Sequence, residues 1–265
     1  MTDDQHDRPL GLRLLPVLLS AIAGSLDVIS LIGLGLFTAH ITGNLALLIA
    51  YLVGGGAARV APLLSIPVFI AVLGATRMFV SQLHSIGLGS LRPLLLLQFL
   101  LLAGCLAVGV AAGPTMDPNA ARTIVAGMLG VSAMAVQNAL GAVSLTGVPP
   151  TAAMTGNVTR LTVDVGEILL GRDTTSEGRA RDRAQRTWPV IAGFAIGCGL
   201  GAACLAAIGR WSLALPASLA LLAIGLGSAG ETRRERSVQL TSDPQRVNIQ
   251  SRRIHRPCPR KSKVI

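Results

Sequence analysis

The residues best suited to chemistry form a polar motif that occurs twice in an otherwise apolar chain. Residues 38–44 read TAHITGN and residues 151–157 read TAAMTGN, so both copies share Thr-Ala-x-x-Thr-Gly-Asn. Two hydroxyls, an amide and a glycine are side chains that a lipid-facing helix has no reason to carry. Polar breaks at corresponding places in two hydrophobic halves are typical of a pseudo-symmetric membrane protein with its site at the repeat interface.

A carboxylate, Asp27, lies inside the first apolar run, one span before the first motif copy. An acid near the bilayer centre costs about 2.5 to 3.5 kcal/mol on the insertion scale, so it faces protein or water. No basic partner is evident in its half of the chain, which favours a functional role over an N-cap or interface position. If burial raises its pKa, Asp27 could carry a proton.

Together these residues predict a polar cavity that binds a small solute. Its predicted lining is Asp27, Thr42, Asn44, Gln137, Asn138, Thr155 and Asn157. The competing interpretation needs no ligand, because Thr and Asn side chains can satisfy the backbone groups that a broken helix exposes. Capping alone, however, does not require the carboxylate.

Other catalytic arrangements are missing from the sequence. The histidines are scattered, no Cys/His set has metal-ligand spacing, and no Walker loop, dinucleotide fingerprint or His-Glu-x-x-His is present. We therefore expect no metal, no cofactor and no enzymatic activity. An intramembrane enzyme is the least supported of the function classes.

The composition indicates the elements that must position this site. Hydrophobic residues make up 51% of the chain and charged residues only 14%, against about 25% charged in soluble domains. We expect an all-α transmembrane bundle, residues 12–229, with repeat halves at about 12–113 and 122–229. The predicted full spans are residues 12–36, 61–80, 94–112, 123–143, 190–208 and 213–229.

The two motif segments are predicted to enter the membrane only partway. Residues 41–53 would form a helix about 20 Å long, short of a hydrocarbon core of about 30 Å. In the second copy Arg160, Asp164 and Glu167 share one helical face, which cannot face lipid along its length. Six full spans would make the halves inverted repeats; eight full spans are the alternative.

Three further features have structural interpretations. Gly193, Gly197 and Gly201 recur every four residues, which predicts close helix packing. Gln98 is expected to form an interhelical hydrogen bond. The segment from Arg172 to Arg186 is expected to be a solvated cytoplasmic loop.

The C-terminal segment, residues 230–265, is predicted to be an unfolded, basic, cytoplasmic tail. Ten Lys or Arg against three acidic residues there supply seven of the net charge of +10. Because the tail lacks aromatic residues for base stacking, its predicted partner is anionic lipid and not nucleic acid. Both termini are expected on the cytoplasmic side of the membrane.

Several of these motifs together resemble those of a known family. Gly24-x-x-Asp27-x-x-Ser30, Phe37 and Thr42-Gly43-Asn44 in the first half are similar to the signature of the YoaK family, bacterial multi-pass membrane proteins of unknown function. In the second half Gln137-Asn138 and Thr155-Gly156-Asn157 fit as well. Val28 and Ala135 are mild departures from the usual alanine and glycine. The resemblance implies a bacterial plasma membrane protein but no substrate.

Two functions remain open from the sequence. The two halves, the polar breaks and Asp27 favour a secondary transporter or permease for a small solute. The glycine stripe favours a non-transporting membrane protein that assembles with or modulates a partner. The oligomeric state is open in both.

Overall fold

In a computed structural model the chain is a bundle of helices. The structure describes residues 10–54, 60–113, 117, 119–145, 149–151, 153–171 and 174–241, and only the backbone of residues 10–13, 174–176 and 228–241. Every regular element in these ranges is helical. The elements are α1 Leu10–Gly33, α2 Ile41–Val53, α3 Val60–Ser85, α4 Leu91–Ala111, α5 Ala121–Ser144, α6 Met154–Leu170, α7 Thr174–Ile208, the 3-10 helix η1 Gly209–Leu213 and α8 Ala214–Thr241.

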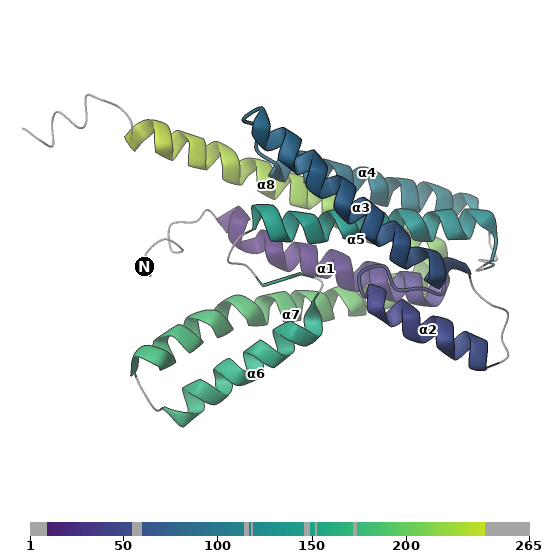
Figure 1. The fold of residues 1–265 in the computed structure, drawn as a ribbon, viewed down its shortest axis with the longest axis horizontal. Coiled ribbons are helices and arrows are strands. Elements are labelled where there is room, and N and C mark those ends of the chain that lie inside the picture. The colour runs from purple at the N-terminus through teal and green to yellow at the C-terminus, as the bar shows by residue number, and fades with distance from the viewer. Residues whose placement is uncertain are drawn as a thin grey trace, which may run out of the picture.

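The long helices α1, α3, α4, α5 and α8 and the later part of α7 run along the bundle, whereas α2 leaves it at one end and α6 leaves it at the other together with the first part of α7 (Figure 1). Five helical stretches of the described chain are long and apolar enough to cross a membrane. The last of them, Glu177–Gly227, contains both α7 and α8, which η1 joins. The expected all-α membrane bundle is confirmed, and α2 is a short apolar helix as predicted.

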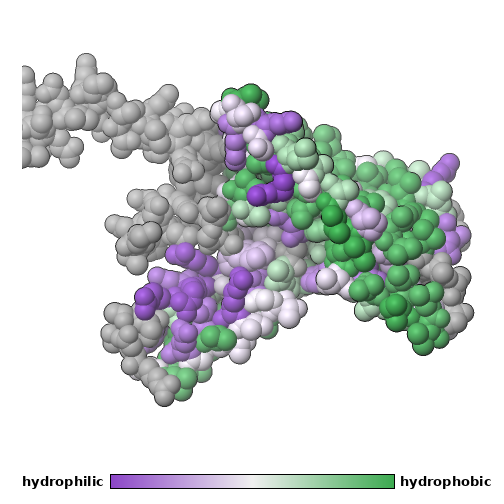
Figure 2. All heavy atoms as spheres, viewed as in Figure 1, coloured by the Kyte–Doolittle hydropathy of each residue, from purple (hydrophilic) through white to green (hydrophobic). Residues whose placement is uncertain are grey.

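The surface of the bundle is apolar over much of its length, as lipid contact requires. Figure 2 shows hydrophobic side chains over the α2 side of the molecule and hydrophilic ones over the arm formed by α6 and α7. On α2, Leu45, Ile49 and Leu52 are more than half exposed. Apolar side chains at this exposure on a helix of an apolar bundle are suited to lipid and not to water.

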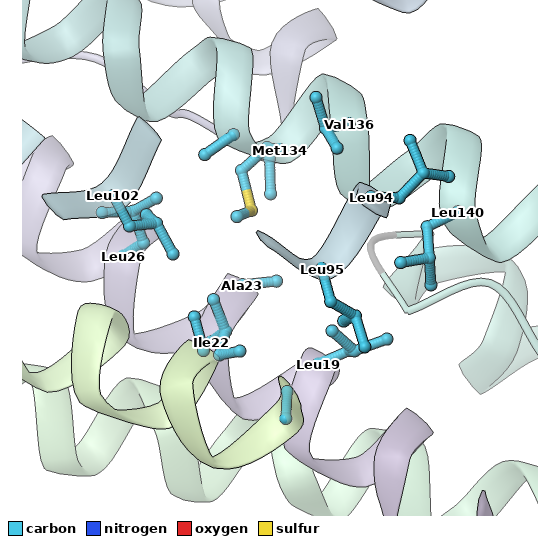
Figure 3. Packing of buried hydrophobic residues seen from close by; sticks show 14 of the residues in the cluster. Leu19, Ile22, Ala23, Leu26, Leu94, Leu95, Leu102, Met134, Val136 and Leu140 are labelled. Atoms are coloured by element: carbon cyan, nitrogen blue, oxygen red, sulfur yellow. The ribbon is translucent and has the colours of Figure 1, made fainter. Parts of the chain in front are cut away.

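The core is organised around α1 and α5, the most deeply buried helices. Leu19, Ile22 and Leu26 of α1 are fully buried in one cluster with side chains of α4 and α5 (Figure 3). In lipid, packing contacts of this kind hold helices together, because lipid tails are as apolar as the side chains. The central helices therefore provide the fixed frame for the site.

Each central helix packs mainly against helices from the other half of the chain. Helix α1 contacts α7 and α8, whereas α5 contacts α3 and α4. Helices α4 and α8 also contact each other, and α2 packs on α3 as α6 packs on α7. The same set of contacts thus occurs twice, with the halves exchanged.

Glycines set the distance between α1 and α7. A Cβ added to Gly193, Gly197 or Gly201 would lie 2.3 to 2.7 Å from a backbone oxygen of α1. No side chain fits at such a separation, so the two backbones are in direct contact. The predicted packing role of the glycine stripe is confirmed.

Three expectations about element boundaries need correction. The first helix ends at Gly33 and not near residue 36, because Gly35 takes a left-handed conformation with φ of 75° that ends a helix. The expected loop from Arg172 to Arg186 is helical from Thr174, where α7 begins. Helix α8 continues to Thr241, so residues 230–241 are helical, and the rest of the expected tail lies outside the described residues.

Candidate functional site

The first motif copy begins in a loop that folds back along α1. Asp27 lies six residues before the end of α1, and its Oδ1 accepts hydrogen bonds from the backbone N–H groups of Thr38 and Ala39 at 2.8 and 2.7 Å. The Thr38 hydroxyl also donates to Oδ1, at 3.0 Å. The carboxylate thus satisfies backbone groups that the break between α1 and α2 leaves free.

The second oxygen of Asp27 contacts a histidine of the motif itself. His40 Nδ1 lies 2.5 Å from Asp27 Oδ2, and the histidine side chain is 33% exposed while that of Asp27 is 4% exposed. The ring of His40 makes edge contacts with Phe37 and with Phe194 of α7. Asp27 therefore has a titratable partner, and the expectation that it has no basic partner in its half is wrong.

The asparagine of the first copy pairs with a peptide group. The backbone N–H of Phe37 donates to Asn44 Oδ1, and Asn44 Nδ2 donates to the carbonyl of Phe37, both at 2.7 Å. Asn44 Nδ2 also donates to Ser65 Oγ of α3 at 2.8 Å. Asn44 is fully buried, so its amide fixes the start of α2 to the loop and to α3.

The second copy repeats this pairing with one bond fewer. Asn157 Nδ2 donates to the carbonyl of Pro150 at 2.7 Å, across the same seven residues. Proline has no N–H, and Asn157 Oδ1 is buried without a hydrogen-bond partner in the described part of the chain. The second loop is therefore held less tightly at this point than the first.

A buried amide on α5 holds the second loop. Gln137 Nε2 donates to Thr151 Oγ1 at 3.0 Å and to the carbonyl of Leu19 at 2.9 Å. Its Oε1 accepts from Gln98 Nε2 of α4 at 2.7 Å, which confirms the predicted interhelical bond of Gln98. On the α1 side, the Ser20 hydroxyl donates to the carbonyl of Val190 at 2.8 Å, and its Oγ also lies 3.3 Å from the carbonyl oxygen of Thr151.

The two loops reach neighbouring levels of both central helices. On α1 their contacts are Asp27 for the first loop and Ser20 for the second, seven residues or about 10 Å apart. On α5 the first loop contacts Gly130, where an added Cβ would lie 3.0 Å from Thr38 Cγ2, and the second contacts Gln137, again seven residues away. Ser20 and Gly130 lie near the middle of their helices, whereas Asp27 and Gln137 lie six and seven residues before the C-terminal ends of α1 and α5.

The structure brings only part of the predicted site together. Asp27, Asn44, Gln137 and Asn157 are buried and bonded to the loops as described above. Thr42 and Thr155 are exposed, and Asn138 donates to the carbonyl of Met134 in its own helix. The predicted lining of a shared cavity by these three residues is therefore not seen.

Sequence reasoning passed over the residues that contact Asp27 and Gln137. These are the first threonine of each copy, Thr38 and Thr151, together with His40. The repeat contained the signal for the threonines, because both are part of the shared pattern. His40 has no counterpart in the second copy, where Ala153 occupies the position, so the repeat could not identify it.

An open pocket of about 530 Å³ lies between α6 and α7, beside the second loop. Its polar lining is Thr159, Arg160 and Asp164 of α6 and Arg183, Arg186 and Thr187 of α7. Asp164 is buried, and Arg183 bonds to it at 2.6 Å and to Glu167 at 2.8 Å. Both acids of this face of α6 are thus paired with one arginine, which comes from the segment that was expected to be a loop.

Within the described residues no group of three His, Cys, Asp or Glu side chains could hold a metal ion. The comparisons with curated proteins and with solved structures returned no match. A family model described as "Protein of unknown function (DUF1275)" matches residues 15–226. The chain therefore belongs to the DUF1275 family, whose model covers both motif copies and every spanning helix.

Proposed function

We propose that this protein is a secondary transporter or permease for a small solute in the bacterial plasma membrane, and not an enzyme. The observation that carries the proposal is the pair of broken segments, α2 and α6, which leave the bundle at opposite ends (Figure 1) while the loops before them fold back and bond to the buried side chains Asp27 of α1 and Gln137 of α5. Broken helices that meet near the midplane between two repeats are the usual construction of a transporter site.

Helix α1 packs on α7 and α8 as α5 packs on α3 and α4. This exchange of partners between the two halves of the chain supports an inverted internal repeat. Helices α1 and α5 hold corresponding places in the contact pattern, and they run in opposite directions along the bundle (Figure 1). Six spans, α1, α3, α4, α5, α7 and α8, then put both ends of the helical region on one side. In such a fold one half rocks against the other, which exposes a central site to each side in turn.

Within this proposal the Asp27–His40 pair carries the coupled proton. Oδ2 of Asp27 contacts the His40 ring while Oδ1 accepts from the loop amides of Thr38 and Ala39, so one carboxylate links the histidine to the backbone of the first loop. A change in the charge of the His40 ring would change how the carboxylate is shared between that ring and the N–H groups of Thr38 and Ala39. Loss of the bonds from these N–H groups frees the first loop, whereas Gln137 holds the second loop with a group that does not titrate.

The experiment is uptake profiling of a deletion strain over a panel of solutes, with the gene restored on a plasmid. A solute whose uptake falls in the deletion strain and returns with the plasmid supports transport. Asp27→Asn and Asn157→Ala are then tested at matched membrane accumulation. Loss of uptake with normal accumulation supports a binding or coupling role, whereas loss of accumulation alone, or no effect of either variant, leaves the residues with a capping role only.

A further inference from the structure

We propose that the pocket between α6 and α7 binds a phosphate-type oxyanion, held by Arg160 and Arg186. This site is separate from the Asp27–His40 pair and does not depend on transport. The bound group is either the phosphate of an anionic lipid headgroup or a free phosphorylated solute. Both sources present the same chemistry to the pocket.

The side chains of the pocket and of its ion pairs carry more positive than negative charge. Arg183 is committed to Asp164 and Glu167, and this triad has a net charge of −1. Arg160 and Arg186 line the same pocket and add two positive charges, so the local net charge is +1. Neither arginine has an ion-pair partner among the residues that the structure describes.

Arg160 is available to a ligand because the acid nearest to it along α6 is paired elsewhere. Asp164 is four residues further along α6, the spacing at which oppositely charged side chains on a helix pair with each other. Asp164 is instead 4% exposed and turned toward α7, where Arg183 contacts its Oδ1 through both Nε and Nη2, at 2.7 and 2.6 Å. Asp164 is therefore paired with Arg183, and Arg160 has no acidic partner in the pocket.

The hydrogen bonds of the two threonines decide which donors of the pocket can hold a ligand. The hydroxyls of Thr159 and Thr187 donate to carbonyls of their own helices, at 3.0 and 2.9 Å. The free donors of the polar lining are therefore guanidinium groups, whose planar fork matches the oxygens of a phosphate. Pro149 and Val163 complete the lining with apolar surface, which suits the glycerol and acyl part of a lipid or the carbon skeleton of a solute.

The test measures binding by the purified full-length protein. In detergent, the thermal unfolding midpoint is followed with increasing inorganic phosphate, with chloride keeping the ionic strength constant. In nanodiscs, bound lipid is counted by native mass spectrometry for phosphatidylcholine alone and for phosphatidylcholine mixed with phosphatidylglycerol. Stabilisation by phosphate in detergent identifies a free oxyanion, whereas retention of phosphatidylglycerol alone identifies a lipid headgroup; either result supports the site.

The deciding variant is the double substitution Arg160→Gln and Arg186→Gln, which leaves Asp164, Glu167 and Arg183 in place. We expect it to weaken binding at least tenfold. The matched control is Arg179→Gln with Arg181→Gln, which removes the same charge from exposed positions of α7 that do not line the pocket. The proposal is overturned if neither probe binds the wild-type protein, or if the control weakens binding as much as the pocket variant does.

Discussion

At the residue scale, the loops of the two motif copies are held in the interior by different side chains. Each loop returns along a central helix and presents unpaired backbone groups to the interior, where an unsatisfied group costs several kcal/mol in hydrocarbon. The first loop is held by a carboxylate and a histidine, the second by a glutamine and a serine. Only the first set contains ionisable side chains, Asp27 and His40.

The two asparagines provide a comparison within one chain. Asn44 makes three side-chain hydrogen bonds, whereas Asn157 makes one to the described residues. At about 1 kcal/mol for each net bond, Asn44→Ala should cost about 2 kcal/mol more stability than Asn157→Ala. Thermal unfolding of both variants in the same detergent measures the difference. Equal midpoints, or a lower midpoint for Asn157→Ala, would show that the pairing with the Phe37 peptide has little weight.

Residue type and spacing predicted part of this site. Asp27, Asn44, Gln137 and Asn157 stood out because polar groups in apolar runs need partners, and all four are buried at the loops. Their partners were not predictable in the same way. The contact between Asp27 and His40 depends on a loop that returns along α1, and hydropathy patterns contain no information about such a return.

At the element scale, α7 carries both the closest helix packing and the outer pocket. Its apolar half is held against α1 by glycines, while its arginine-rich half extends into the arm that it forms with α6 (Figure 1). The sequence indicated the apolar half, but the arginine-rich half was misread as a loop. Arginine is a good helix former, and the ion pairs with α6 give this half a packing partner.

The packing of α7 on α1 can be tested with two neighbouring glycines. A Cβ at Gly197 would lie 2.3 Å from the carbonyl oxygen of Ala21, whereas a Cβ at Gly199 would meet nothing within 4 Å. Gly197→Ala should therefore cost about 1 to 3 kcal/mol through overpacking. Gly199→Ala should leave stability unchanged or raise it by up to about 1 kcal/mol, because alanine is the better helix former. Unfolding midpoints and membrane accumulation of the pair provide the measurement, and similar losses in both would contradict the close contact.

At the scale of the whole molecule, the main contacts of α1 and α5 run between the first four helices and the last four. Both central helices come first in their half, and both pack mainly against the third and fourth helices of the other half. The division of the chain into two repeat halves remains a prediction from the repeated motif. The exchange of partners was not predictable, because apolar helices of similar composition offer no sequence signal for which neighbours they choose.

The directions of the helices allow a prediction of orientation in the membrane. Figure 1 places the end of α3 at the end of the bundle where α1 begins, as six spans require. A reporter fused after Ser85 should therefore report the cytoplasm, and one fused after Asn119 the outside, because the arginine-rich part of α7 lies at the Ser85 end. Eight full spans would exchange the two results.

The central claim is that the Asp27–His40 pair couples a proton to solute movement, and His40→Gln tests it most directly. Glutamine can still donate a hydrogen bond to Asp27 but does not titrate at physiological pH. The measurement is the initial rate of uptake of the solute identified by profiling, over a range of external pH and at matched membrane accumulation. His84→Gln, at an exposed position near the end of α3, is the control. The account predicts that His40→Gln lowers uptake at least about tenfold, equivalent to about 1.4 kcal/mol, and removes its pH dependence, while His84→Gln leaves both unchanged. Wild-type uptake with a wild-type pH profile in His40→Gln would contradict it.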